Sequence, residues 1–79
     1  MIATLTGVVA EREGDSLVIQ TDGGVGYSVS VSIGVAQRLP PRGARVSLFT
    51  ELVVKEDGWA LYGFDTSLER LVFRQLLSA

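Results

Sequence analysis

The stretch that decides the fold runs from Arg45 to Phe64 and reads RVSLFTELVVKEDGWALYGF. Its first half, residues 45–54, is rich in Val, Phe and Leu, which are typical of a β-strand. Residues 55–58, Lys-Glu-Asp-Gly, have the composition of a turn, and residues 59–64 return to apolar and aromatic side chains. The stretch therefore predicts a β-hairpin with charged residues at its tip.

Three more strands are predicted upstream of this hairpin. Residues 27–32 read Tyr-Ser-Val-Ser-Val-Ser, an alternation that places the apolar side chains on one face and the serines on the other. Residues 2–10 and 17–19 predict two strands that form a hairpin, with the polar run 11–15 as their turn. Residues 21–24, Thr-Asp-Gly-Gly, close the second strand, because paired glycines can adopt the positive φ values of a tight turn.

Two helical segments complete the predicted secondary structure. Residues 33–39 have apolar side chains at helical spacing, and Pro40-Pro41 ends this segment because proline lacks an amide hydrogen. Residues 66–69, Thr-Ser-Leu-Glu, have the spacing of a capping box, which predicts a helix at the end of the chain. Five short strands, with a helical segment between the third and fourth, match the mainly β OB-fold, a five-stranded Greek-key barrel.

The terminal helix carries more apolar surface than one small barrel is expected to cover. One helical face holds a first apolar row, made of Leu68, Leu71, Val72, Gln75 and Leu76. Phe73 and Leu77 widen this surface. We therefore expect the helix to lie outside the barrel and to need another surface to pack against, with Phe73, Leu76 and Leu77 partly uncovered.

The composition limits the chemistry that the chain can perform. Its 79 residues include no cysteine and no histidine, which removes disulfides, thiolate metal sites and the commonest general base. The sequence is 47% hydrophobic and 20% charged, so it should fold as one domain. A net charge of −2 opposes phosphate binding, so the chain alone should bind DNA poorly. No apolar stretch is long enough to span a bilayer and no signal peptide is recognisable, which favours a cytoplasmic protein without membrane association.

Glu56 and Asp57 are the only adjacent carboxylates in the sequence. Paired carboxylates can serve as general acid and base or hold a divalent cation, but turns also favour these residues as solvated groups. Neighbours in a tight turn usually diverge, and no third ligand lies close in sequence. The preferred interpretation is a solvated turn, and we expect no catalytic residue, metal, cofactor or small-molecule substrate.

Three other features have a functional and a plainer interpretation. Residues 23–26, Gly-Gly-Val-Gly, lead into a strand and lack a following Lys-Ser or Lys-Thr pair, which favours a turn over a phosphate cradle. Five aromatic residues could form a stacking platform for single-stranded bases or pack in the core, with Trp59 the best candidate for exposure: Tyr27, Phe49, Trp59, Tyr62 and Phe64. Arg42, Arg45 and Lys55 could touch phosphates, but Arg12, Arg38, Arg70 and Arg74 are scattered among nine acidic residues, so a solvated surface is the plainer interpretation of these cations.

Five short motifs follow one another along the chain: MIATLTG (1–7), GGVGY (23–27), FT (49–50), VKED (54–57) and LYGF (61–64). A helix beginning at Thr66, with Glu69-Arg70 and Phe73, follows them. Taken together, in this order and at this spacing, they resemble the RuvA family of Holliday junction branch migration subunits. The resemblance covers the whole chain.

The resemblance implies a division of the chain and a set of partners. Residues 1–64 would form an OB-fold domain, and residues 65–79 the first helix of a following domain, ending before its first helix-hairpin-helix motif. In the complete protein the partners would be four-way junction DNA, the RuvB ATPase motor, the RuvC resolvase and three further copies in a homotetramer. The family's role is non-catalytic, in DNA recombination and repair. Because those hairpin motifs hold phosphate in the family, residues 1–79 alone should bind junctions weakly.

The resemblance also implies a role for Glu56 and Asp57 as an acidic pin, a carboxylate pair that points into the centre of the junction. Such a pair would repel phosphates and disfavour continuous duplex there without cutting a strand. Lys55, where the family often has arginine, is a candidate phosphate contact, and Ala3 replaces the family's usual glycine. The alternative is a generic OB-fold module that binds single-stranded nucleic acid by aromatic stacking.

Overall fold

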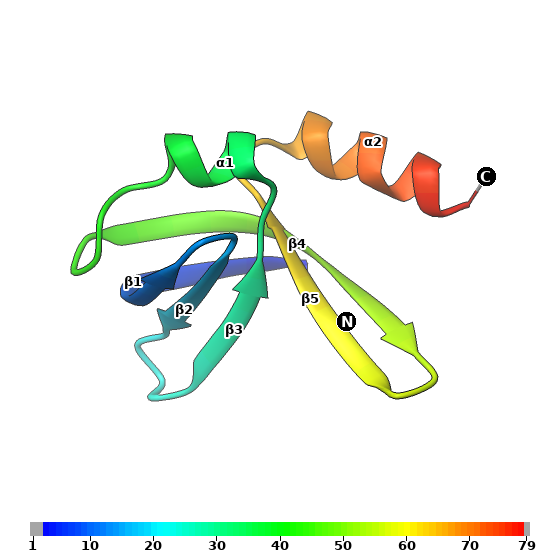
Figure 1. The fold of residues 1–79 in the computed structure, drawn as a ribbon. Helices are drawn as coiled ribbons and strands as arrows, with labels where there is room; N and C mark the ends of the chain where they lie inside the picture. The colour runs from blue at the N-terminus through cyan, green and yellow to red at the C-terminus, as the bar shows by residue number, and fades with distance from the viewer. Residues whose placement is uncertain (1–2, 79) are drawn as a thin grey trace.

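The computed structural model describes residues 3–78 (Figure 1). Met1, Ile2 and Ala79, which the sequence-based boundaries include, lie outside this part of the chain. The elements are, in order, β1 (Thr4–Glu13), β2 (Ser16–Gln20), β3 (Gly26–Ser30), α1 (Ile33–Arg38), β4 (Arg45–Lys55), β5 (Gly58–Phe64) and α2 (Ser67–Leu77). The five strands close into a barrel in the order β1-β2-β3-β5-β4. The predicted OB-type architecture is thereby confirmed.

β1 closes the barrel because it pairs with two strands. Residues 4–8 lie antiparallel to β4, and residues 8–13 lie antiparallel to β2. A bulge between Val9 and Glu11 marks the passage from one pairing to the other, as bulges that bend a strand commonly do. The predicted turn at residues 11–15 is therefore too long. Residues 11–13 continue the strand with exposed side chains, because β2 offers them backbone partners up to Glu13.

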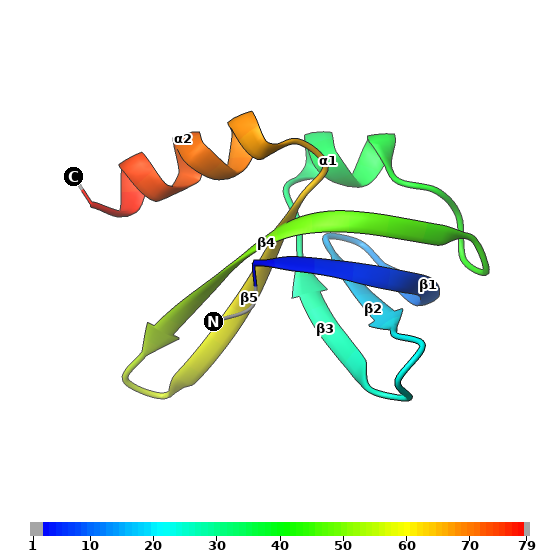
Figure 2. The same cartoon turned by 180° about the vertical axis from the view of Figure 1, so that it is seen from behind.

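β3 and β5 make the only parallel contact of the barrel, among residues 3–78, and it is short. A single register pair, Ser30 opposite Tyr62, joins them. Beyond this contact the β2–β3 and β4–β5 hairpins diverge, and the β4–β5 hairpin projects away from the other strands (Figures 1 and 2). The barrel is thus tight near α1 and splayed at the opposite side.

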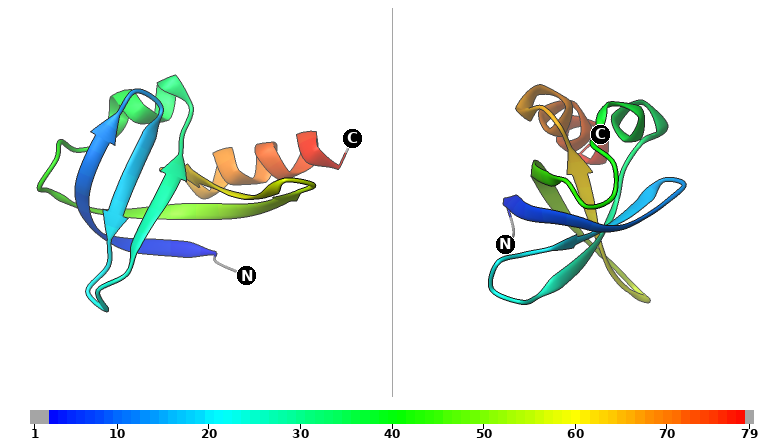
Figure 3. Two further views of the ribbon diagram at one scale, coloured as in Figure 1. Left: turned by 60° about the horizontal axis from the view of Figure 1, so that its bottom comes forward. Right: turned by 90° about the vertical axis from the view of Figure 1, so that its left-hand side faces the viewer.

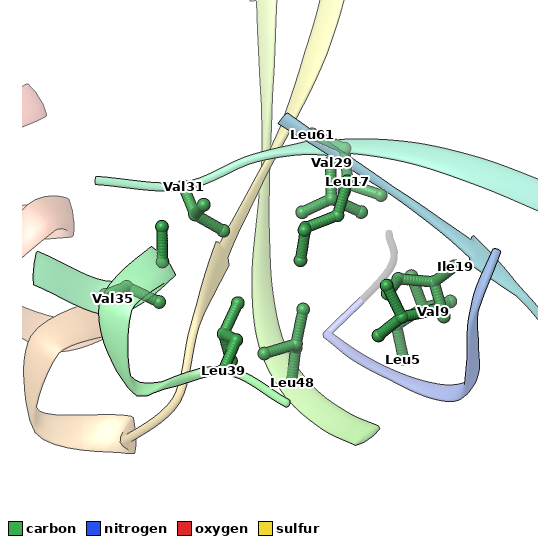
Figure 4. Close-up of a cluster of buried hydrophobic side chains, with 11 residues drawn as sticks. Leu5, Val9, Leu17, Ile19, Val29, Val31, Val35, Leu39, Leu48 and Leu61 are labelled. Atoms are coloured by element: carbon green, nitrogen blue, oxygen red, sulfur yellow. The ribbon is translucent and has the colours of Figure 1, made fainter. Parts of the chain in front are cut away.

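The hydrophobic core fills the barrel interior (Figure 4). Its residues alternate along the strands, and Val9, Ile19 and Val29 are completely buried. α1 lies across one end of the barrel and adds Val35 and Ala36 to the core. The alternation predicted for residues 27–32 is confirmed, since its valines are buried and its serines are not.

The two ends of α1 are satisfied by different means. At the start, Ser32 is the N-cap, and its hydroxyl accepts a hydrogen bond from the Val35 amide at 3.2 Å. At the end, the guanidinium of Arg12 donates to the Leu39 carbonyl at 3.0 Å, to the Pro40 carbonyl at 2.9 Å, and also to the Ala36 carbonyl. The Ala36 carbonyl also accepts a hydrogen bond from the Leu39 amide at 3.3 Å, and Arg12 adds to this cap and extends it to the two residues that follow the helix. Arg12 therefore ties β1 to α1.

α2 lies alongside the β4–β5 hairpin, outside the barrel, as predicted (Figure 3). Thr66 caps it by accepting a hydrogen bond from the Glu69 amide. Its contact face is centred on half-buried Phe73, whose ring centroid lies 5.0 Å from that of Tyr62 and 5.1 Å from that of Phe64. The first apolar row does not make this contact: its exposed members are Leu68, Leu71, Val72 and Leu76.

The exposed row confirms that α2 carries more apolar surface than the barrel covers. Leu76 and Leu77 are exposed, and Phe73 is only half-buried, as expected. With 11 residues, α2 is the longest helix in the described part of the chain. No helix within residues 3–78 is long and apolar enough to cross a membrane.

Candidate nucleic-acid interface

The tip of the β4–β5 hairpin is a turn formed by Glu56 and Asp57. The last register pair before it joins Lys55 to Gly58. Gly58 has φ of +140°, a conformation that glycine adopts without the steric penalty of a Cβ atom. The sequence placed the carboxylate pair at a hairpin tip, and the structure confirms this position.

Both tip carboxylates are free of local partners. Glu56 and Asp57 are exposed, and neither carboxylate makes a hydrogen bond or an ion pair within residues 3–78. No cluster of three potential metal ligands forms in this part of the chain. The pair is therefore an uncompensated patch of negative charge at the end of a projecting hairpin.

Lys55 is adjacent to the tip in sequence, but its ammonium group does not pair with the carboxylates. Its Nζ lies 3.3 Å from the Tyr62 hydroxyl and 5.8 Å from the centroid of the Tyr62 ring. The side chain therefore lies back along the hairpin towards the face that carries α2. An exposed lysine in such a weak contact can swing out to another partner.

Five of the arginines are engaged inside the domain, which corrects their interpretation as a simply solvated surface. Arg12 binds the carbonyls at the end of α1. Three others form ion pairs, which are Arg38–Asp65, Arg38–Glu69, Arg45–Asp22 and Arg74–Glu51. Arg70 donates to the Ala3 carbonyl at 2.7 Å and lies over the Phe49 ring at 5.2 Å. Because carboxylates neutralise most of these cations, the candidate phosphate contacts left in the described residues are Arg42 and Lys55.

Three of these arginines position the α2 helix. Arg70 reaches the Ala3 carbonyl just before β1, and Arg74 reaches Glu51 of β4. Both come from the same helical face as Phe73, so α2 is held by polar contacts on both sides of an aromatic one. In addition, Arg38 of α1 binds Asp65 and Glu69 around the start of α2. These connections are long-range in sequence, which explains why the sequence pattern did not reveal them.

The pKa values of the ion-paired groups follow from their geometry. Two hydrogen bonds from Arg38 hold the pKa of the Asp65 carboxyl below its usual value, and the same contact raises the pKa of Arg38. Hydrogen bonds with Arg45 likewise lower the pKa of Asp22 and raise that of Arg45. These groups are charged at neutral pH and belong to the structural framework rather than to the tip.

The aromatic residues separate into buried and accessible groups. Phe64 is buried, in line with core packing, whereas Tyr27, Phe49 and Tyr62 are half-buried. Trp59 is 71% exposed, which confirms it as the accessible aromatic, and it stands opposite Val54, which is 80% exposed. Large apolar side chains thus lie in the open immediately behind the acidic tip.

The glycine-rich stretch 23–26 is a turn, as predicted, and not a phosphate cradle. The Gly24 amide donates to the Thr21 carbonyl at 3.0 Å, and the Thr21 amide donates to the Val25 carbonyl at 2.9 Å. Only Gly24 of this stretch has a positive φ, at +95°, so one glycine rather than a pair supplies the turn conformation. The stretch connects β2 to β3.

The chain is thus a domain of the OB class, a closed barrel with a partner-free carboxylate pair and an exposed tryptophan on one projecting hairpin, within residues 3–78. The model of one family, described as the RuvA N-terminal domain, matches residues 1–63. The chain therefore belongs to the RuvA N-terminal domain family.

Curated relatives agree with this assignment. The chain is 49% identical over 77 residues to the Holliday junction branch migration complex subunit RuvA of Leptothrix cholodnii, covering 98% of the chain and 40% of that protein. The protein of the same name from Gemmatimonas aurantiaca is 44% identical over 79 residues, covering 100% of the chain and 40% of that protein. The Neisseria gonorrhoeae protein of this name is 46% identical over 77 residues, covering 98% and 39%. The chain thus spans about 40% of the length of these relatives.

Proposed function

We propose that this chain is the N-terminal domain of a Holliday junction-binding subunit, which assembles as a homotetramer on four-way DNA junctions. The domain acts in the cytoplasm, in branch migration during recombination and repair, together with the RuvB ATPase motor and the RuvC resolvase. Support comes from the family match and from the relatives, which are named as branch migration complex subunits. The role is non-catalytic, without cofactor or small-molecule substrate, and ATP is hydrolysed by the partner.

Within this proposal, residues 1–64 form the barrel domain and residues 65–79 open the domain that follows. The outward apolar row of α2 supports the division, because exposed leucines on an otherwise docked helix need a further surface to pack against. The greater length of the relatives supports it as well. The next domain supplies the phosphate contacts that a chain with a net charge of −2 lacks.

The observation that carries the proposal is the partner-free carboxylate pair, Glu56 and Asp57, at the tip of the projecting hairpin. A carboxylate about 4 Å from a phosphate repels it by about 1 kcal/mol in water and about 4 kcal/mol at an effective dielectric constant of 20. Four such tips around one centre would add their repulsion. Continuous duplex across that centre is disfavoured, whereas a junction with an open centre is tolerated.

Lys55 contributes positive charge just behind the pin. Within residues 3–78 its ammonium group is held only by the Tyr62 hydroxyl and ring, so a phosphate can replace that contact. A strand deflected by the carboxylates would then meet a cation on the α2 side of the hairpin. Repulsion at the tip and attraction behind it together guide separated strands without breaking them.

The test is a competition titration of four-way junction against linear duplex, with the complete protein that contains this chain. The double variant Glu56→Gln and Asp57→Asn removes both charges and keeps the side-chain size. Duplex binding should tighten more than junction binding, so the junction-to-duplex affinity ratio should fall.

A matched control removes two charges elsewhere. Glu11→Gln with Glu13→Gln changes the net charge by the same amount, and both residues are exposed on the β1–β2 hairpin. This control should leave the affinity ratio close to that of the wild type. Equal ratios for the pin variant and the wild type would reduce Glu56 and Asp57 to ordinary turn residues.

A further inference from the structure

An uncharged groove opens where the β2–β3 and β4–β5 hairpins diverge. It has a volume of about 210 Å³ and is lined by Gly26, Tyr27, Ser28, Leu52, Trp59 and Leu61. At about 30 Å³ per water molecule, this is room for roughly seven waters. The groove therefore admits a group of the size of one planar heterocycle.

The walls of the groove suit such a ring. Trp59 comes from β5 and Tyr27 from β3, so each hairpin contributes an aromatic side chain. Leu52 and Leu61, which are register partners, provide apolar surface, and Gly26 and Ser28 of β3 complete the wall. Trp59 is 71% exposed, and covering so large an apolar ring with a flat partner is favourable.

Charge decides which part of a nucleic acid can enter. Among residues 3–78, no charged side chain lines the groove. Asp57 lies two residues before Trp59, and its exposed carboxylate, like that of Glu56, repels phosphate. A nucleobase carries no charge and stacks on any aromatic face, whereas the backbone is kept away. The groove is thus complementary to a base and not to a phosphate or an acidic peptide.

We propose that this groove binds one unpaired nucleobase, stacked on Trp59, from a strand that has been separated at the hairpin tip. The inference rests on the proposed function, because separation of strands is what supplies an unpaired base. It adds an attractive site beside the repulsive pin. The two together hold the open state: the pin excludes duplex, and the groove retains a base that has left its pair.

The experiment uses the complete protein that contains this chain and a four-way junction with unpaired 2-aminopurine at the crossing. A mobility shift reports junction binding, and 2-aminopurine fluorescence reports stacking of the base. In the wild type, binding should quench the fluorescence. Trp59→Ala should remove that quenching and weaken binding about fivefold or more, the lower end of the range for stacking of one base.

Two further variants separate stacking from a general disturbance of the hairpin. Trp59→Phe keeps an aromatic face and should retain most of the quenching. Val54→Ala shortens the exposed register partner of Trp59, which does not line the groove, and should behave like the wild type. Quenching that persists in Trp59→Ala, or that is lost equally in Val54→Ala, would overturn the proposal.

The DNA offers a second control. When the crossing bases are replaced by abasic sites, the phosphates remain and only the stacking partner is lost, so wild type and Trp59→Ala should bind equally. A persistent difference would contradict base binding. If a second copy of the chain fills the groove instead, Trp59 is covered before DNA is added. The part of the tryptophan emission that Trp59→Phe removes will then be protected from quenching by acrylamide, and this result would overturn the proposal.

Failure of the proposed function can be told apart from failure of the groove. If the complete protein shows no preference for junction over duplex, single-stranded oligonucleotides with and without bases are added instead, and the part of the tryptophan emission that Trp59→Phe removes is followed. A change in this Trp59 emission that depends on the bases then supports the groove on its own. Equal signals from intact and abasic strands overturn it.

Discussion

Arg74 of α2 places its Nε atom 2.6 Å from Oε1 of Glu51, a β4 residue that is only 8% exposed. A carboxylate this far out of water is costly unless a charged donor faces it. Arg74 supplies that donor while its own side chain remains 41% exposed. The contact satisfies a buried acid and fixes α2 on the hairpin at the same time.

Removal of the Arg74 side chain should therefore destabilise the domain. In Arg74→Ala, Glu51 stays buried without its donor, and we expect a loss of about 2 kcal/mol in the free energy of unfolding. Urea denaturation of wild type and variant measures it. In a Glu51→Gln background, the same arginine truncation should cost distinctly less, because no buried charge is left unpaired. Equal costs in both backgrounds would contradict this account.

Arg12 should matter far more than its exposed position suggests. Its guanidinium satisfies three carbonyls at the end of α1, so Arg12→Ala should cost about 1–3 kcal/mol. Arg42→Ala is the matched control, because Arg42 is exposed and makes no side-chain hydrogen bond or ion pair within residues 3–78, and it should change stability by less than about 0.5 kcal/mol. Chemical denaturation of both variants decides between a structural and a solvated Arg12.

Gly7 is a position where only glycine fits. A Cβ atom there would lie 2.3 Å from the backbone oxygen of Gln20, so β1 and β2 would have to separate locally. We expect Gly7→Ala to cost about 3 kcal/mol or more. Gly23→Ala is the control, since its Cβ would meet nothing within 4 Å, and its thermal midpoint should stay near that of the wild type. Similar midpoints for the two variants would refute the steric explanation.

The Arg38–Asp65 contact predicts a stability difference that depends on pH. Because hydrogen bonds from Arg38 lower the pKa of Asp65 in the folded state, the stabilisation is fully present above the unfolded pKa of about 4. It is lost as the pH falls through the lower folded pKa. Wild type should thus exceed Asp65→Asn in stability at pH 6, and the gap should close towards pH 2. In an Arg38→Gln background, the difference in stability that Asp65→Asn causes should be small at both pH values.

The sequence predicted the elements whose signals are local. The β4–β5 hairpin was predicted because its turn chemistry and its apolar flanks are contiguous, and α2 was predicted because Thr66 and Glu69 carry the capping signal within one turn. The end of β1 was wrong, since Glu11, Arg12 and Glu13 look like a turn until their partners in β2 are known. Long-range pairing overrode local composition there.

For the candidate site, the position of the tip was predictable and its surroundings were not. The exposure of Trp59 followed from its place beside the charged turn. Its proximity to Tyr27 depends on how β3 and β5 diverge after their short parallel contact, which no sequence pattern encodes. The arginine contacts were missed for a similar reason, because Arg12 and Arg74 find their partners 24 and 23 residues away.

Salt should weaken the effect of the acidic pin on DNA selectivity. Replacing Glu56 and Asp57 by Gln and Asn should leave folding almost unchanged, because both carboxylates are exposed and have no partner within residues 3–78. Their effect on DNA acts through space, so it should weaken as the screening length shortens from about 30 Å at 0.01 M to about 8 Å at 0.15 M ionic strength. The difference in junction-to-duplex affinity ratio between wild type and double variant should therefore be largest at low salt. It should shrink steadily as salt is added.

Competition titrations at several salt concentrations measure this difference directly. Salt also weakens all phosphate contacts of the complete protein, so absolute affinities will fall for every variant. The Glu11→Gln, Glu13→Gln control corrects for this, because it removes the same number of charges from another hairpin. If the pin repels the strands, the pin variant will change the junction-to-duplex affinity ratio more than the control variant does at low salt. This excess will decline as the screening length shortens. A difference that is independent of salt would point to altered shape at the tip instead of repulsion, and the electrostatic role of Glu56 and Asp57 would be withdrawn.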